Sequence, residues 1–146
     1  MTPRTLRAAA LLAAIAVAGC GAGASTLTPT VVAPTAGPSS GPRPSSPAVV
    51  AIVQPANGAA ITGDSVHIVL ALTGATIVTA TTTTIRPDQG HVHLLVDNVV
   101  VSMNYGLEQD LPVHPGTYVL KAEFVAADHA PFNPRVFSTE VFFTVK

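Results

Sequence analysis

The C-terminal part of the chain alternates apolar and polar positions with a period of two, which predicts β-strands. Strand-like segments lie at 48–54, 66–72, 91–96, 99–103, 117–126 and 136–145. Turn-forming residues separate them, most clearly Pro55-Ala56-Asn57-Gly58 and Pro115-Gly116. No segment combines a helix start signal with an apolar period of 3.6 residues. The pattern predicts an all-β domain, an immunoglobulin- or fibronectin-like β-sandwich of about seven antiparallel strands.

A two-residue hairpin turn is predicted at Asp97-Asn98. The register that this turn imposes pairs Val96 with Val99, Leu94 with Val101 and Val92 with Met103. Every pair on this face is apolar, so it is the predicted core face, and Met103 is expected in the core and not as a soft copper ligand. The opposite face carries His91 and His93, about 7 Å apart along the strand.

Two further segments have a predicted structural role. Leu111 to Tyr118, with Pro115-Gly116 between them, resembles the tyrosine corner of β-sandwiches, so Tyr118 is expected to be architectural. In the last strand one face is expected to carry Phe137, Val141, Phe143 and Val145.

The histidines are the residues with the greatest chemical potential in this weakly charged chain. His91 and His93 project from one face at a spacing from which two imidazoles can converge on one copper or zinc ion. His129, with Asp128 beside it, and His114 are the candidates for further ligands. A blue-copper site is excluded because the domain has no thiolate. Alternatively, His91 and His93 are polar residues of a solvated sheet face that bond to Ser102 and Asn104. His67 is expected at the surface.

The N-terminus resembles a bacterial lipoprotein signal. Arg4 and Arg7 precede eleven apolar residues, 8–18, which suit a signal-peptide core but are too few to span a bilayer. The run ends in Val17-Ala18-Gly19-Cys20, a lipobox-like sequence whose cysteine is expected to carry lipid, including palmitate, after export. The alternative is an ordinary secretory signal with an incidental cysteine. Residues 1–19 are therefore assigned to a signal peptide.

Residues 20–47 form a Pro-, Gly-, Ser- and Thr-rich segment with Arg43 as its one charge. Such a composition buries too little apolar surface to offset its ordering entropy, so we expect a disordered tether. The folded domain is assigned to 48–146.

Charge and motifs exclude several function classes. Residues 48–146 hold eight acidic against four basic side chains, a net charge of −4, which disfavours binding of nucleic acid. The single cysteine excludes an intrachain disulfide framework. No nucleophile elbow, H-E-x-x-H motif or phosphate loop is present, so the protein is not expected to be an enzyme and no catalytic residue is assigned.

Four segments together resemble a family of bacterial exported domains, domain of unknown function 4399. They are Gln54-Pro55-Ala56-Asn57-Gly58, Gly90-His91-Val92-His93-Leu94-Leu95-Val96-Asp97, Pro115-Gly116-Thr117-Tyr118-Val119-Leu120 and Asp128-His129-Ala130-Pro131. The family pattern reads G-H-H-H-L-L-I-D, P-P-G-x-H-T-L and D-H-x-P, and the resemblance covers roughly residues 50–146. It implies a periplasmic or surface β-sandwich and brings no established activity.

The resemblance transfers position by position. The residues that match the signature are Gly90, His91, His93, Asp97, Asp128 and His129. Val92, Tyr118 and Phe132 stand where the family usually has histidine, and each departure removes a potential metal ligand.

We therefore expect an extracytoplasmic lipoprotein, anchored to the cell membrane through Cys20, whose β-sandwich is a binding module for an envelope protein or small ligand. The alternative is a periplasmic copper- or zinc-binding domain that uses His91 and His93, with His129 as third ligand.

Overall fold

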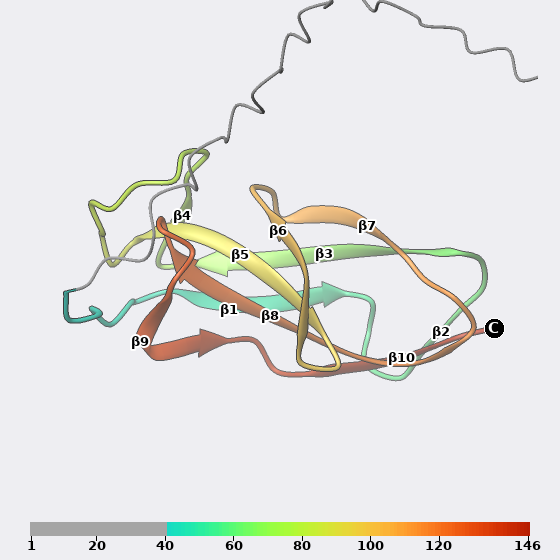
Figure 1. The fold of residues 1–146 in the computed structure, drawn as a ribbon. Helices are drawn as coiled ribbons and strands as arrows, with labels where there is room; N and C mark the ends of the chain where they lie inside the picture. Colours follow the sequence, from blue (N-terminus) through green and yellow to red (C-terminus); the bar gives the residue numbers. More distant parts are fainter. Residues whose placement is uncertain (1–40) are drawn as a thin grey trace, which may run out of the picture. The chain divides into compact units, whose positions relative to one another are not determined.

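Two β-sheets face one another in the computed structural model, which describes residues 41–146 (Figure 1). The strands of the described residues are β1 (Val49–Gln54), β2 (Ala59–Ile61), β3 (Ser65–Thr73), β4 (Thr76–Ile77), β5 (Gln89–Val96), β6 (Val99–Asn104), β7 (Glu108–Pro112), β8 (Gly116–Ala126), β9 (Pro131–Phe137) and β10 (Val141–Val145). No helix within 41–146 is long and apolar enough to cross a membrane. The predicted signal peptide 1–19, Cys20 and most of the predicted tether lie outside the described residues.

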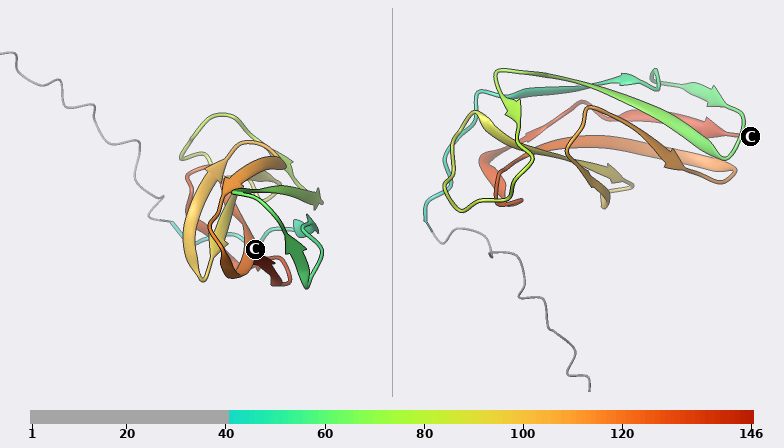
Figure 2. Two further views of the ribbon diagram at one scale, coloured as in Figure 1. Left: turned by 90° about the vertical axis from the view of Figure 1, so that its right-hand side faces the viewer. Right: turned by 90° about the horizontal axis from the view of Figure 1, so that it is seen from above.

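The smaller sheet has the strand order β1-β3-β7, and the larger has β2-β10-β8-β5-β4, with β6 also on β5 and β9 also on β8. The strands run along a common long axis (Figure 2). Two short strands pair in parallel, β2 with β10 and β4 with β5, and the other pairs are antiparallel. The predicted all-β sandwich is confirmed, and β2, β4 and β7 are strands that the sequence pattern did not predict.

The inner faces of the sheets form one apolar core. Its buried members include Val66, Ile68, Leu70, Val92, Leu94, Leu120, Ala122, Phe124 and Phe143. These residues alternate along β3, β5 and β8, as the period of two predicted.

The β5–β6 hairpin has the predicted turn but not the predicted register. Asp97 and Asn98 both have positive φ, the combination that a two-residue type I′ turn requires. Beyond the first pairs a β-bulge shifts the register, so that His93 pairs with Met103 and not with Ser102. An extra residue moves every later side chain of β6 to the other face. The predicted core position of Met103 is therefore wrong, and its side chain is 57% exposed on the outer face.

The predicted last strand is divided into β9 and β10, because the chain leaves the ladder of β8 at 138–140. Phe137 pairs with Glu123, whereas Val141 pairs with Leu120. Val141 thus lies four residues after Phe137, whereas their partners on β8, Glu123 and Leu120, lie three residues apart. The one extra residue places Phe137 and Val141 on opposite faces of the sheet. Phe137 consequently lies half-exposed on the outer face, and its predicted place beside the buried Val141 is wrong.

Tyr118 forms the predicted corner at the start of β8. Its hydroxyl donates to the carbonyl of His114 at 2.8 Å and accepts from the His114 amide at 3.0 Å. Its ring stacks on Phe143, with centroids 5.1 Å apart. The hydroxyl thus ties the preceding loop to the sheet.

We expect Tyr118→Phe to lower the free energy of unfolding by about 1–2 kcal/mol, because it removes two backbone hydrogen bonds and keeps the stacked ring. Urea unfolding of the two proteins measures the difference. Tyr105→Phe is the matched control, because Tyr105 meets the domain through its ring and is 45% exposed. Equal stability of Tyr118→Phe and the unmodified chain would contradict the structural role of the hydroxyl.

Candidate functional site

Three histidines meet on the outer face of the larger sheet. His91 and His93 come from β5, and His129 comes from the loop between β8 and β9. The facing nitrogens, Nε2 of His93 and Nδ1 of His129, are 3.1 Å apart. The ring of His129 also stacks on that of His91, with centroids 4.3 Å apart and planes 13° apart. The structure therefore brings together the three histidines that the sequence analysis selected.

The backbone of His129 adopts the left-handed conformation, with φ of 64°. Its amide donates to the carbonyl of Ala126, and the amide of Ala126 donates to the carbonyl of Ala130. A non-glycine residue with positive φ is uncommon, although histidine tolerates it better than most. This tight loop turns the chain back so that the His129 ring lies over β5.

The cluster is buried, which excludes a solvated sheet face as an explanation of the strand histidines. His91 is fully buried and His93 is 7% exposed. The ring of Tyr105 contacts the His91 ring edge-on at 4.9 Å. The expected hydrogen bonds to Ser102 and Asn104 do not form, since Ser102 bonds to Gln109 between the sheets.

Hydrogen bonds fix part of the protonation pattern. Nε2 of His91 donates to the carbonyl of Ala127 at 3.2 Å, because a carbonyl oxygen only accepts. Nδ1 of His91 is buried and makes no hydrogen bond among the described residues. Nε2 of His129 lies 3.2 Å from the hydroxyl of Thr81, in the loop that precedes β5. His129 is therefore held on both of its nitrogens.

Burial lowers the pKa of both strand histidines. For His91 the proximity of His129 acts in the same direction, and the Ala127 and Val78 carbonyls and the Asp128 carboxylate oppose it. For His93, His129 again lowers the pKa, and the Glu123 carboxylate opposes it. The outcome is a pair of neutral imidazoles near pH 7, the form that ligates metals.

The two carboxylates closest to the cluster are each paired with an arginine. Glu123, directly opposite His93 on β8, is 2% exposed and accepts two hydrogen bonds from Arg135, at 2.6 and 2.7 Å. The guanidinium of Arg135 also lies over the ring of Phe137, with 4.5 Å between its central carbon and the ring centroid. The negative charge of Glu123 is thereby largely compensated at this face.

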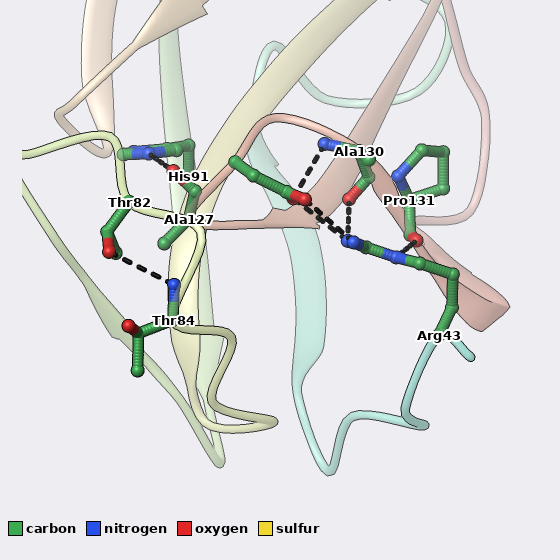
Figure 3. A network of polar contacts seen from close by, with 8 residues as sticks. Arg43, Thr82, Thr84, His91, Ala127, Ala130 and Pro131 are labelled. Atoms are coloured by element: carbon green, nitrogen blue, oxygen red, sulfur yellow. Dashed lines mark hydrogen bonds and ion pairs between the residues drawn. The ribbon is translucent and has the colours of Figure 1, made fainter. Parts of the chain in front are cut away.

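Asp128 is paired with Arg43, a residue of the predicted tether. Its side chain is fully buried and accepts from Nη1 and Nη2 of Arg43 at 2.7 and 2.9 Å. Arg43 also donates to the carbonyls of Ala130 and Pro131 (Figure 3). The ion pair of Arg43 and Asp128 thus holds the loop of His129. The Asp128 carboxylate, which was predicted as a possible metal ligand, is therefore already engaged by Arg43.

Arg43 and Pro44, in the described part of the predicted tether, therefore contact the domain. Composition alone suggests a disordered segment, but a specific buried acceptor outweighs the ordering entropy of the few residues around Arg43. The amide of Asn133 also donates to the carbonyl of Pro44.

Arg43→Ala is expected to lower the free energy of unfolding by about 3 kcal/mol, because it leaves a buried carboxylate without its principal cation. Chemical denaturation of the full-length chain measures this loss. Arg86→Ala is the control, because Arg86 and Asp88 are both well exposed. The double variant Arg43→Ala/Asp128→Asn should regain part of the stability, because it also removes the buried charge. A double variant less stable than Arg43→Ala would contradict the stabilising role of the Arg43–Asp128 ion pair.

The remaining candidates lie elsewhere or have structural roles. His114 precedes β8 and His129 follows it, so eleven strand residues, roughly 35 Å, separate them. His67 is exposed, as predicted, on the other sheet and pairs with Asp110. A Cβ on Gly90 would lie 1.9 Å from the Val125 carbonyl, so this position requires glycine. Asp97 closes the hairpin turn and exchanges hydrogen bonds with Val119.

Four residues that support the cluster were not predicted from the sequence: Arg43, Thr81, Tyr105 and Glu123. Only Glu123 carried a signal, as an acidic residue within an otherwise apolar stretch. The other three reach the site through tertiary contacts over long sequence separations.

The three imidazoles do not converge on one point. The His91 and His129 rings are parallel and stacked, so their in-plane lone pairs do not meet. Within residues 41–146 no group of three or more His, Cys, Asp and Glu side chains is arranged to hold a metal ion. The facing nitrogens of His93 and His129 are the one pair of the cluster that point at one another, and they share a hydrogen bond at 3.1 Å.

Comparison with solved structures finds fibronectin(III)-like modules of CbhA from Clostridium thermocellum, which are 18% identical in sequence and align with a TM-score of 0.46. The alignment covers 67% of this chain and 96% of that chain. An engineered protein aligns at 17% identity and a TM-score of 0.41, over 68% of this chain and 20% of that chain, so this chain spans about a fifth of its length. No family model and no curated protein matches the chain.

Proposed function

We propose that this protein is an extracytoplasmic, lipid-anchored binding module whose β-sandwich binds a transition-metal ion through His93 and His129. The observation that carries the proposal is the 3.1 Å separation between Nε2 of His93 and Nδ1 of His129. Two nitrogens bonded to one ion at about 2 Å each lie about 3–4 Å apart, depending on the angle at the metal. A small displacement of one ring therefore admits an ion.

The surroundings of the pair support metal binding. Imidazole nitrogen is a ligand for copper, zinc and nickel, and it must be neutral to bind. The lowered pKa of His93 keeps it neutral near pH 7. Nε2 of His129 meets the Thr81 hydroxyl, the kind of outer partner that orients a ligating histidine.

Copper and zinc binding is tested by titrating the full-length chain, in detergent, with Cys20→Ser to remove its one thiol. We expect one ion per chain for at least one of the two metals. His93→Ala and His129→Ala should each weaken binding by at least about 100-fold, because each removes a nitrogen ligand. His67→Ala is the control and should leave the affinity unchanged. Equal affinity of all four proteins would exclude the site.

The lipid anchor is supported by the sequence Val17-Ala18-Gly19-Cys20 at the end of an apolar run. Metabolic labelling with palmitate should mark the protein and place it in the membrane fraction, since two or more acyl chains give lasting attachment. Cys20→Ser should abolish the labelling, because it removes the thiol that carries the lipid. A labelled Cys20→Ser protein, or an unlabelled unmodified chain, would contradict lipidation at this residue.

A second candidate function is the binding of another envelope protein along β6. Among the described strands β6 pairs only with β5, so its other backbone edge is available. Its residues Val99, Val100, Val101 and Met103 are exposed and uncharged. Edge strands usually carry charges or proline that prevent pairing, which β6 lacks. The partner that fits this edge is an extended apolar strand of another protein.

A photo-crosslinking amino acid at Val99 tests this second candidate in intact cells. We expect a single adduct with another envelope protein, lost when Val101→Lys places a charge on the apolar edge. The same label at Val49, which is 63% exposed against 64% for Val99, is the matched control. Adducts of equal yield from both positions would reject the edge as a specific surface, and an adduct with a second copy would indicate self-association.

A further inference from the structure

We infer that the site between His93 and His129 selects copper(I) over divalent ions, with the thioether of Met103 as a third ligand; the inference rests on the metal-binding function proposed above. Three observations carry it: the alignment of the two rings, the place of Met103 in the sheet, and the charge of the surroundings.

The rings of His93 and His129 lie end to end. Their planes differ by 15°, and their centroids are 5.5 Å apart while the facing nitrogens are 3.1 Å apart. The separation of the centroids exceeds that of the nitrogens by about the width of one ring. Each ring therefore extends away from the other, and the line through the two nitrogens passes close to both ring centres. The in-plane bonding directions of the two nitrogens therefore point at one another along a line. In this structure the two nitrogens share a hydrogen bond along that line, so one of them carries a proton that a bound ion must displace.

This alignment matches the coordination preference of copper(I). The d¹⁰ ion accepts two ligands in a line, and bonds of about 2 Å require facing nitrogens about 4 Å apart. The 3.1 Å separation needs to open by about 1 Å, without turning either ring. Zinc prefers four tetrahedral ligands, so it requires the rings to be re-aimed. Copper(II) accepts two nitrogens in a line as trans ligands, but its tetragonal set needs two further ligands in the same plane. Within residues 41–146 no group of three or more His, Cys, Asp and Glu side chains is arranged to supply them.

Met103 lies directly opposite His93 on the neighbouring strand β6. It is the register partner of His93 on the antiparallel neighbour β6, so both side chains leave the same face of the sheet. Side chains of directly opposite residues start about 5 Å apart, within reach of a flexible thioether. The β-bulge after Leu94 creates this position; in an unbroken register Met103 would face the core. Because its side chain is 57% exposed, it is free to turn toward the ion.

The ligand chemistry and the local charge favour a soft, singly charged ion. A thioether is a soft ligand that selects copper(I). His93 is buried, and the nearby carboxylates, Glu123 and Asp128, are already paired with Arg135 and Arg43. The cost of burying an ion rises with the square of its charge, so a monovalent ion is tolerated here more readily than a divalent one.

The experiment measures three affinities in the full-length Cys20→Ser chain, in detergent and without oxygen. Copper(I) is measured by competition with bicinchoninate, and copper(II) and zinc by direct titration. We expect the tightest binding for copper(I), at one ion per chain. Met103→Leu should weaken copper(I) binding by at least about tenfold and change zinc and copper(II) binding by less than about twofold, since a thioether is a poor ligand for both.

A second measurement observes the ligand directly. With ¹³C-methyl methionine labelling, addition of silver(I), a redox-inert analogue of copper(I), should shift the Met103 methyl resonance, and zinc should not. His67→Ala is the control for both measurements. Met103→Leu keeps the fold because this side chain is largely exposed, so its effect on affinity does not depend on the stability of the histidine variants.

The outcomes separate the two proposals. Zinc or copper(II) binding through His93 and His129, without a preference for copper(I), overturns this inference and leaves the proposed function standing. Binding of copper(I) that Met103→Leu does not weaken, or an unshifted methyl resonance, removes Met103 from the site and overturns the inference. Absence of binding by every ion overturns both.

Discussion

The antiparallel pairing of β5 with β8 is the constraint on which the rest of this structure depends. It runs from Gly90 opposite Ala126 to Val96 opposite Leu120, at the centre of the larger sheet. In this pairing the side chains of Val92 and Leu94 face the core. Because successive side chains of a strand alternate between faces, His91 and His93 lie on the outer face. The pairing and β8 both end at Ala126, where the loop that carries His129 begins. One register therefore decides both the core and the position of the candidate site.

The site is stabilised from segments that are distant in the sequence. Arg43 precedes the first strand, yet its bonds to Asp128, Ala130 and Pro131 hold the loop in which His129 adopts a left-handed backbone. The hydroxyl of Thr81, from another loop, contacts Nε2 of His129, the nitrogen that does not face His93. Such an arrangement keeps an uncommon backbone conformation in place, because several independent contacts must be broken together to release it. The position of the one ring that is not on a strand is thus determined by the whole end of the domain.

A β-bulge in β6 and the break between β9 and β10 decide which side chains lie on the outer face. The extra residue in β6 moves Met103 outward beside His93, and the extra residue between β9 and β10 moves Phe137 outward beside Arg135. In both places a face predicted from simple alternation is exchanged, because one unpaired residue reverses the parity of every later position. Bulges leave no mark in the hydrophobic pattern of Val99-Val100-Val101, where all residues are apolar and either register satisfies the alternation. This is why the sequence analysis placed Met103 in the core.

The sequence by itself determined the features that depend on short-range pattern: the all-β class, the turn at Asp97-Asn98, the Tyr118 corner and the core faces of β3 and β5. These follow from alternation and turn chemistry, which act between near neighbours along the chain. The tertiary structure alone decided the burial of His91 and His93, the contact of His129 with both, and the pairing of Asp128 with Arg43. Such features arise where loops fold back on a sheet, and the free energy of those contacts is absent from any local stretch of the chain.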